Sequence, residues 1–215
     1  MKKLIIAAMA LTCATAIVSA ETVTSENIVG YNKAVTTTGL QILGTAFLTG
    51  NDTPPGVFGD SLPVGSKIFA YNGTGYDISV FKSGFGGVTF WDNETLNIGQ
   101  AIGYWVDIPS GTQTNIISGD VEISDSVTNS ITTGLQLLSY PYPVARTVPE
   151  LGFTPSVGDK IFVYNGTGYD ISVFKAGFGG VTFWDNTTLT IKVGSGFWYD
   201  SVGSTNWIAT RPFTP

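Results

Sequence analysis

The sequence predicts an all-β protein made of two tandem, duplicated antiparallel β units that follow a cleaved signal peptide. Its main feature is an internal repeat: Lys67–Asp107 recurs as Lys160–Asp200, offset by 93 residues, with 31 of 41 positions identical. A self-match at one fixed offset indicates a duplicated structural unit. Short β-rich runs alternate with turns about every 8 to 12 residues, which favours a sandwich or barrel-like unit. We therefore divide the chain into a signal peptide (1–20), β unit 1 (21–117) and β unit 2 (118–215).

The first twenty residues have the pattern of a secretory leader. Two lysines follow Met1, Leu4–Val18 is apolar, and Val18-Ser19-Ala20 fits a small-residue cleavage site. The apolar run is too short to cross a bilayer comfortably, and no run of about 18 apolar residues follows it. We expect a mature chain that begins at Glu21, has no membrane span and is secreted, extracellular or on the cell surface, with the periplasm as an alternative. Retention of the leader as a membrane anchor and attachment of a lipid to Cys13 are less favoured.

The composition excludes several kinds of chemistry from the mature chain. The sequence has no histidine, and its one cysteine lies in the leader. Histidine-assisted nucleophiles, zinc sites built from imidazole or thiolate, and disulfides are therefore not expected. About 195 residues can still bury a core without disulfides. The 10 basic residues are outnumbered by 16 acidic ones and form no cluster, so we do not expect nucleic acid as a partner.

Unit 1 opens with two predicted strands separated by a turn. Ile28–Ala34 follows a polar lead, Thr36-Thr37-Thr38-Gly39 is the turn, and Leu40–Leu48 is the second strand. We expect Ile28–Ala34 to pair within its own unit. The alternative is that Glu21–Lys33 pairs with an open sheet edge of a neighbouring copy, which would give open-ended assembly.

A segment rich in proline and glycine follows in each unit, at Gly50–Gly56 and Pro141–Thr154. Proline and glycine interrupt helices and strand ladders, so both segments are predicted to be surface loops.

The repeated block is predicted to consist of strands. Lys67–Tyr71 and Tyr76–Phe81 flank Asn72-Gly73-Thr74-Gly75, whose glycines can take positive φ, and this pattern predicts a hairpin in each unit. A second glycine-rich connection, Ser83–Gly87, precedes the next strand. The remaining predicted strands are Val88–Trp91, Ala101–Asp107, Thr112–Ile117 and Thr205–Thr210.

The second unit resembles a family of small modules found in secreted and surface proteins of bacteria. Leu135–Pro143, Ile161–Asp170 and Val193–Asp200 carry the resemblance to its pattern, G-x-N-L-I-x-N-P-Y, then Y-x-W-N-G-x-G-Y, then P-G-x-G-F-W-V. Gln136 replaces the usual asparagine, and unit 1 departs further, with Thr45-Ala46-Phe47 at the Tyr-Pro-Tyr position. The resemblance implies a β-rich extracellular module. It implies no particular activity and no catalytic residue.

Carboxylates offer the remaining catalytic chemistry. A glycosidase needs two of them, and Asp77 with Asp92, or Asp170 with Asp185, are the candidates. All four lie next to turns or at strand ends, where Asp commonly bonds the backbone, and we favour that structural role. Calcium would accept such oxygen ligands, but the sequence has no calcium-loop motif, so we predict no metal and no cofactor and leave a structural calcium as an alternative.

The aromatic residues are the richest candidate binding features. Neighbours in a strand, such as Phe90 and Trp91, point to opposite faces. We expect one face to pack the core of its own unit and the other to pack the twin unit about a pseudo-twofold axis. The alternative is a stacking platform for sugar rings or a partner, with Asp and Asn bonding the hydroxyls. The candidate binding residues are Tyr71, Tyr76, Trp91, Asp92, Asn93, Trp105, Tyr164, Tyr169, Trp184, Asp185, Asn186 and Trp198.

These observations lead to three hypotheses of function. The first is a non-catalytic surface or matrix protein that acts through protein contacts, as an adhesion or assembly subunit that binds a protein partner or itself. The second is a glycan-binding module that uses the repeated aromatic and Asp-Asn positions. The third is a carboxylate-based glycosidase.

Overall fold

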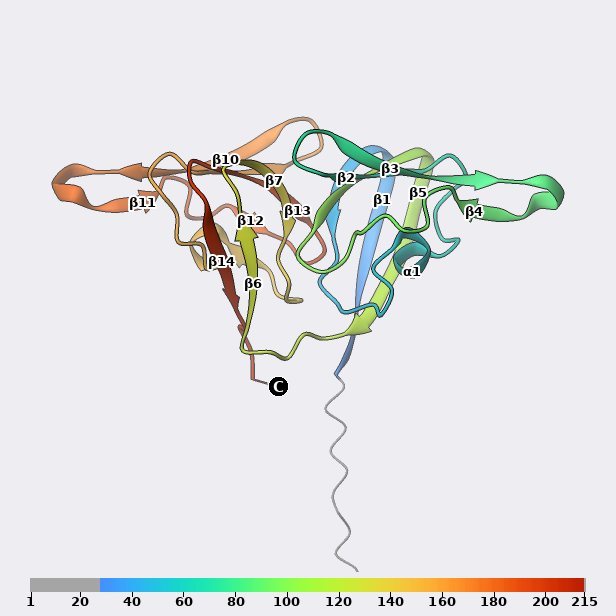
Figure 1. Cartoon of the computed structure of the whole chain (residues 1–215), viewed down its shortest axis with the longest axis horizontal. Helices are drawn as coiled ribbons and strands as arrows, with labels where there is room; N and C mark the ends of the chain where they lie inside the picture. Colours follow the sequence, from blue (N-terminus) through green and yellow to red (C-terminus); the bar gives the residue numbers. More distant parts are fainter. Residues whose placement is uncertain (1–27, 215) are drawn as a thin grey trace, which may run out of the picture.

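A computed structural model describes residues 28–214 of the chain, and these residues confirm the predicted all-β, antiparallel class. They form two five-stranded sheets and two two-stranded sheets (Figure 1), and all strand pairs in these sheets are antiparallel. The arrangement is sandwich-like. None of the helices within this part of the chain has the length and apolar character that crossing a bilayer requires.

The large sheet of unit 1 has the strand order β1-β5-β2-β3-β4. The strands are β1 (Val29–Gly44), β2 (Lys67–Tyr71), β3 (Tyr76–Ser83), β4 (Thr89–Trp91) and β5 (Gly103–Asp120).

The large sheet of unit 2 has the equivalent order β7-β13-β9-β10-β11. Two small sheets, β6-β14 and β8-β12, complete this unit. The strands are β6 (Ser126–Ile131), β7 (Gly134–Ser139), β8 (Arg146–Thr147), β9 (Lys160–Tyr164), β10 (Tyr169–Ala176), β11 (Thr182–Trp184), β12 (Thr190–Ile191), β13 (Gly196–Ser201) and β14 (Thr205–Thr210).

The predicted turn at Thr36–Gly39 is wrong. β1 continues through it with a β-bulge between Thr37 and Gly39, because both halves of β1 pair with the same strand, β5. β5 likewise joins two predicted strands into one, and the predicted boundary between residues 117 and 118 lies inside it. In unit 2 the corresponding strands are broken, and their halves belong to different sheets.

The start of β1 pairs within its own unit, as expected. Val29 lies opposite Asp120 and Lys33 lies opposite Ile116 of the same chain. Residues 21–27, like the predicted signal peptide, lie outside the described residues.

The two proline- and glycine-rich segments contain short helices as well as loops. The α-helix α1 (Pro54–Phe58) begins with two prolines, which are compatible with the first turn of a helix, and it buries Val57 and Phe58. A 3₁₀ turn, Val148–Leu151, buries Val148 and Leu151 in unit 2. Prediction from proline and glycine content alone missed the apolar side chains that cover each core.

Each unit has its own hydrophobic core on the inner face of its large sheet. In unit 1, Ile68, Phe81 and Trp91 pack beneath α1, and in unit 2 their counterparts pack near Trp207. Phe90 is 42 % exposed whereas Trp91 is 3 % exposed, which confirms that neighbouring aromatic residues point to opposite faces.

The outer faces of the two sheets meet through reciprocal contacts. Tyr71 of unit 1 packs edge-on against Trp198 of unit 2 with ring centroids 5.0 Å apart, and Trp105 packs against Tyr164 at the same distance. Two main-chain hydrogen bonds are also reciprocal: Gly44 N–H to the Gly194 carbonyl (3.0 Å), and Ser139 N–H to the Ala101 carbonyl (3.1 Å). In each pair, the second contact repeats the first with the two units exchanged. A pseudo-twofold axis produces this relation.

Candidate functional site

Four of the candidate residues, Tyr71, Trp105, Tyr164 and Trp198, form the contact between the units. Trp91 and Trp184 are also unavailable for stacking, because they are 3 % and 7 % exposed in the two cores. The indole N–H of Trp91 donates to the Gly59 carbonyl at 2.9 Å. Each of these two residues fills the core of its own unit, which is the packing that we favoured over the alternative of a stacking platform.

The side chains of Tyr76 and Tyr169 are partly exposed to solvent beside the contact between the units. They are 43 % and 41 % exposed. Each packs edge-on against the tyrosine across its hairpin, Tyr76 against Tyr71 at 5.5 Å and Tyr169 against Tyr164 at 5.6 Å. They border two shallow apolar hollows on the outer faces of the sheets.

We name these hollows by unit. Hollow 1, about 300 Å³, is lined by Leu40, Phe69, Tyr76 and Trp105. Hollow 2, about 370 Å³, is lined by the equivalent residues Leu135, Phe162, Tyr169 and Trp198, and also by Tyr71 and Tyr76 of unit 1. Four equivalent positions thus line a hollow in each unit, and hollow 2 has two further aromatic walls from unit 1.

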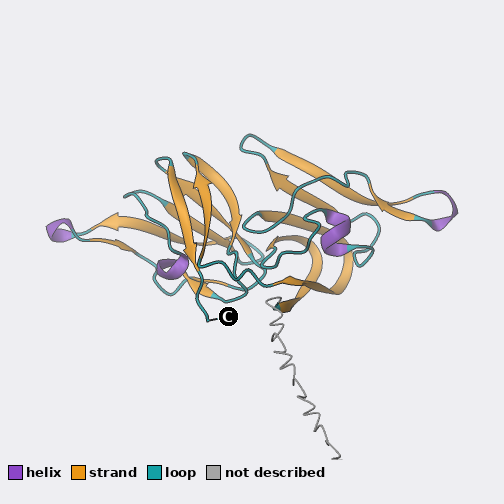
Figure 2. Cartoon of the chain, turned by 60° about the horizontal axis from the view of Figure 1, so that its bottom comes forward, coloured by secondary structure: helices purple, strands orange, loops and turns teal. Residues whose placement is uncertain are grey.

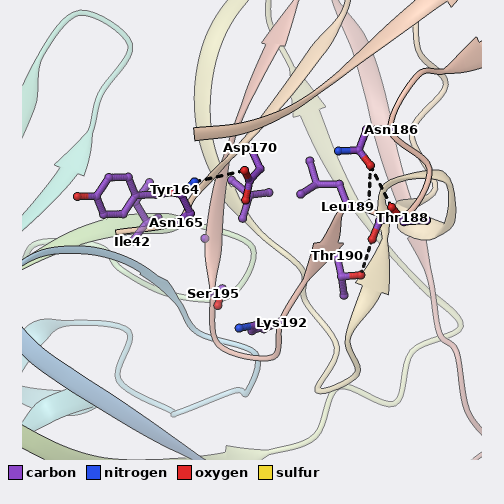
Figure 3. Close-up of a pocket in the computed structure, with 12 residues that line it drawn as sticks. Ile42, Tyr164, Asn165, Asp170, Asn186, Thr188, Leu189, Thr190, Lys192 and Ser195 are labelled. Atoms are coloured by element: carbon purple, nitrogen blue, oxygen red, sulfur yellow. Dashed lines mark hydrogen bonds between the residues drawn. The ribbon is translucent and has the colours of Figure 1, made fainter. Parts of the chain in front are cut away.

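A polar pocket of about 520 Å³ lies beside the hairpin turn of unit 2 (Figure 3). Asn165 donates from Nδ2 to Asp170 Oδ1 at 3.2 Å, while Asn186 Oδ1 accepts from the Thr188 hydroxyl at 3.2 Å. Lys192 and Ser195 also line the pocket. Amide, carboxylate, hydroxyl and ammonium groups converging around one cavity can hydrogen-bond a polyhydroxylated ligand.

Unit 1 lacks this pocket chemistry. At the positions of Lys192 and Ser195 it has Gly99 and Ile102, and the Asp52 side chain lies where a side chain at position 99 would project. Thr188, Lys192 and Ser195 were missed as binding candidates. A signal existed for the last two, because they stand where the otherwise similar repeats differ.

The Asp-Asn pairs have the structural role that their turn positions predict. Asp92 forms an ion pair with Lys82 (2.8 Å) and accepts a hydrogen bond from Val80 N–H, and Asp185 does the same with Lys175 (2.7 Å) and Val173 N–H. The hydrogen bond from the lysine lowers the pKa of each carboxyl group below its ordinary value. Asn93 and Asn186 each accept from a threonine hydroxyl two residues later. Residues 28–214 contain no cluster of three or more metal-ligating side chains.

Two hairpin arms project from opposite ends of the molecule (Figure 1). β3 with β4 forms one arm, and β10 with β11 forms the other. Each tip is a short 3₁₀ turn, Phe85–Gly87 or Phe178–Gly180, which Figure 2 shows at the far end of the arm. Two consecutive glycines with φ between +74° and +81° shape each tip, and bulkier residues rarely adopt this conformation.

The arm tips expose their aromatic side chains completely. Phe85 and Phe178 are each 103 % exposed, and Val88 and Val181 beside them are 66 % and 63 % exposed. A main-chain hydrogen bond of 2.7 Å closes each tip, from Gly84 N–H to the Val88 carbonyl and from Gly177 N–H to the Val181 carbonyl. Sequence reasoning left Phe85 and Phe178 out of the candidate site. The usable signal was a large aromatic residue between glycines, which has no neighbouring side chains to pack against.

Comparisons of the chain with protein-family models, with curated proteins and with solved structures found no match. The resemblance to bacterial surface modules therefore stays a prediction.

Proposed function

We propose that this chain is a non-catalytic secreted protein of a bacterial surface or matrix that acts through protein contacts, as an adhesion or assembly subunit. The complete exposure of Phe85 and Phe178 at the two arm tips carries the proposal. Fully burying a phenylalanine side chain is worth about 1.5–3 kcal/mol relative to leaving it exposed, so each tip is an unused source of binding energy. Aromatic anchors of this kind dominate the energetics of many protein interfaces.

The orientation of the arms is suited to linking two partners. The tips lie at opposite ends of the long axis (Figure 1), so one molecule can contact two partners at once. Two linked contacts of modest strength give a much higher overall avidity than either contact alone.

Two of the four candidate carboxyl groups, those of Asp92 and Asp185, do not suit the acid role of a glycosidase. A glycosidase acid has to be protonated when the substrate binds, which requires a raised pKa. The pKa values of Asp92 and Asp185 are instead lowered, chiefly by hydrogen bonds from Lys82 and Lys175. Both groups are therefore charged near neutral pH and are unsuited to the acid role.

A double variant, Phe85→Ser with Phe178→Ser, tests the proposal. We expect it to be released into the medium, while the wild-type chain remains with the cell surface or matrix fraction. Circular dichroism should be unchanged, because both side chains lie fully in solvent. Equal retention of the variant and the wild type would contradict the proposal.

A second candidate function is glycan binding in the polar pocket of unit 2. The convergence of Asn165, Asp170, Asn186 and Lys192 around one cavity favours it. A glycan array probed with the wild-type chain, and with a Lys192→Gly variant that copies unit 1, provides the test. Binding that depends on Lys192 supports this function, and the absence of binding to any glycan removes it.

A further inference from the structure

We infer that the partner of each arm tip is a second copy of this chain, and that the tip phenylalanine of one copy inserts into an aromatic hollow of another. This inference rests on the proposed function, because it names the partner that the tips bind. It adds a receptor site, hollows 1 and 2, which the proposed function does not require.

The two surfaces match in number and in kind. Each copy has two identical knobs, Phe85 and Phe178, and two equivalent hollows. The hollows are lined by leucine and aromatic side chains, and their volumes of about 300 and 370 Å³ lie at the lower end of the range for ligand pockets. Such a hollow suits one aromatic side chain with part of its hairpin better than a large ligand.

The contact between the units already shows how this sheet face receives an aromatic side chain. Tyr71 lies at the end of β2, beside a hairpin turn, and its ring packs edge-on against Trp198 at 5.0 Å. Tyr71 also forms one wall of hollow 2. A tip phenylalanine docked in the hollow would extend this existing interface, and edge-to-face packing is favourable for such rings.

The geometry excludes insertion into the hollows of the same copy. The hollows lie where the two sheets meet, whereas the arms point away from that centre to the two ends of the molecule (Figure 1). Two copies that exchange knobs with each other form a closed, isologous pair, whereas copies that each pass a knob to the next copy form a heterologous contact. Contacts of this type give open chains or networks unless the rotation between copies happens to close a ring.

The charge of the protein predicts how salt affects the assembly. The formal net charge is −6, so neighbouring copies repel one another. Added salt screens this repulsion, and an apolar contact does not depend on ion pairs that salt would weaken. We therefore expect self-association to increase between low and moderate ionic strength.

A complementation experiment tests the inference, with the expected mature chain from Glu21 onward. The knob variant carries Phe85→Ser and Phe178→Ser. The hollow variant carries Leu40→Glu and Leu135→Glu, at side chains that are 48 % and 47 % exposed, so both variants should fold. Ile116→Ser is the matched control, because it removes an exposed apolar side chain from β5, away from tips and hollows.

Analytical ultracentrifugation over a hundredfold range of protein concentration gives the readout. We expect the wild type and the control to form species that grow with concentration, and each variant alone to remain monomeric. A mixture of the two variants should associate again, because one supplies intact hollows and the other supplies intact knobs. A contact between two tips, or between two hollows, does not predict this recovery.

Three results would overturn the inference. They are a wild type that stays monomeric at every concentration and salt level, a hollow variant that associates as the wild type does, and a mixture that does not recover association. The second result would indicate contact between tips. In all three cases the proposed function stands separately, because it is judged by whether the knob variant is lost from the surface fraction.

Discussion

Unit 1 buries Thr36 and Asn115 at the strand positions where unit 2 buries Ile131 and Trp207. The register shows the equivalence: Ala34 lies opposite Asn115 in one unit, and Asn129 lies opposite Trp207 in the other. In unit 1 the Asn115 amide donates to the Thr36 hydroxyl at 3.1 Å, while in unit 2 the Trp207 ring stacks on Phe153 at 4.7 Å. The same pair of strands can therefore bury either a polar pair or an aromatic stack, provided that each buried polar group has a hydrogen-bond partner.

The hairpins and arms of the two units differ much less in sequence and in hydrogen bonding. Between Lys67 and Asn93 the sequence matches its copy in unit 2 except at Ala70 and Ser83. The hairpin turns have the same hydrogen bonds, with Asn72 N–H bonded to the Gly75 carbonyl at 3.1 Å and the counterpart bond at 3.0 Å. The units thus differ mainly in the covering of their cores, in the continuity of the strands there, and in the polar pocket of unit 2.

The largest expected effect comes from the aromatic stack. Trp207 is fully buried, and its indole N–H donates to the Leu151 carbonyl at 2.7 Å. We expect Trp207→Ala to lower the free energy of unfolding by about 3–5 kcal/mol, because it leaves a cavity and an unpaired carbonyl. Urea denaturation measures this loss.

The equivalent substitution in unit 1 is the comparison. Asn115→Ala removes the partner of Thr36 and should cost only about 1–3 kcal/mol. The Asn115 Oδ1 atom has no hydrogen-bond partner among the described residues, so no second bond is lost with it. Equal losses for the two variants would show that the polar pair and the aromatic stack contribute alike.

The next effect concerns the centre of the molecule, where each unit places a glycine against the main chain of the other. A Cβ atom at Gly103 would lie 2.5 Å from the Leu138 carbonyl oxygen, and one at Gly196 would lie 2.6 Å from that of Leu43. We expect Gly103→Ala and Gly196→Ala each to cost about 1–3 kcal/mol, because the clashing atoms belong to the main chain. Thermal unfolding tests this, with Gly75→Ala as the control, since a Cβ atom there meets nothing within 4 Å. A control that costs as much as the central variants would remove the packing explanation.

The sequence predicted the repeated parts of the fold better than the unique parts. Strand alternation and the Asn-Gly turns located both hairpins, because local geometry determines them. The bulge at Gly39 could not be distinguished from a turn, since that difference depends on whether the flanking segments share one partner strand. The exposure of Phe85 and the burial of Trp91 depend on where the hairpin leaves the core. That is a tertiary property, and residue type does not reveal it.

A smaller effect is expected at the base of the arms, equally in both units. The pKa values of Asp92 and Asp185 are lowered in the folded state, so their stabilising effect is present above the ordinary Asp pKa of about 3.9 and is lost as the pH falls through the folded values. A surface ion pair is worth at most about 1 kcal/mol. We expect Asp92→Asn with Asp185→Asn to lower stability slightly at pH 7 and to leave it unchanged once the pH has fallen below the lowered pKa values of the two carboxyl groups. Thermal unfolding across this range measures the difference, and a constant loss at all pH values would contradict the role of the charge.

The smallest expected effect lies at a position where the two units use different residues for one conformation. Ala101 is the one non-glycine residue with positive φ among residues 28–214, at +64°, and Gly194 occupies the equivalent position at +74°. The left-handed conformation costs alanine about 1–2 kcal/mol, which Ala101→Gly would relieve. The same change removes a methyl group that is 4 % exposed, at about 0.8 kcal/mol, and adds freedom to the unfolded chain worth about 0.4–1 kcal/mol.

These contributions nearly cancel, so Ala101→Gly should change the free energy of unfolding by less than about 0.5 kcal/mol. The reverse change in unit 2 reduces the freedom of the unfolded chain, but this gain does not offset its costs. Gly194→Ala adds the cost of the left-handed conformation and pushes its methyl group against the Asn32 side-chain amide. We expect it to destabilise the protein by more than about 1 kcal/mol in urea denaturation. A clear loss on Ala101→Gly would mean that packing of the methyl group against unit 2 outweighs the strain. The two units would then join at this point through the side chain as well as through the Ser139 to Ala101 hydrogen bond.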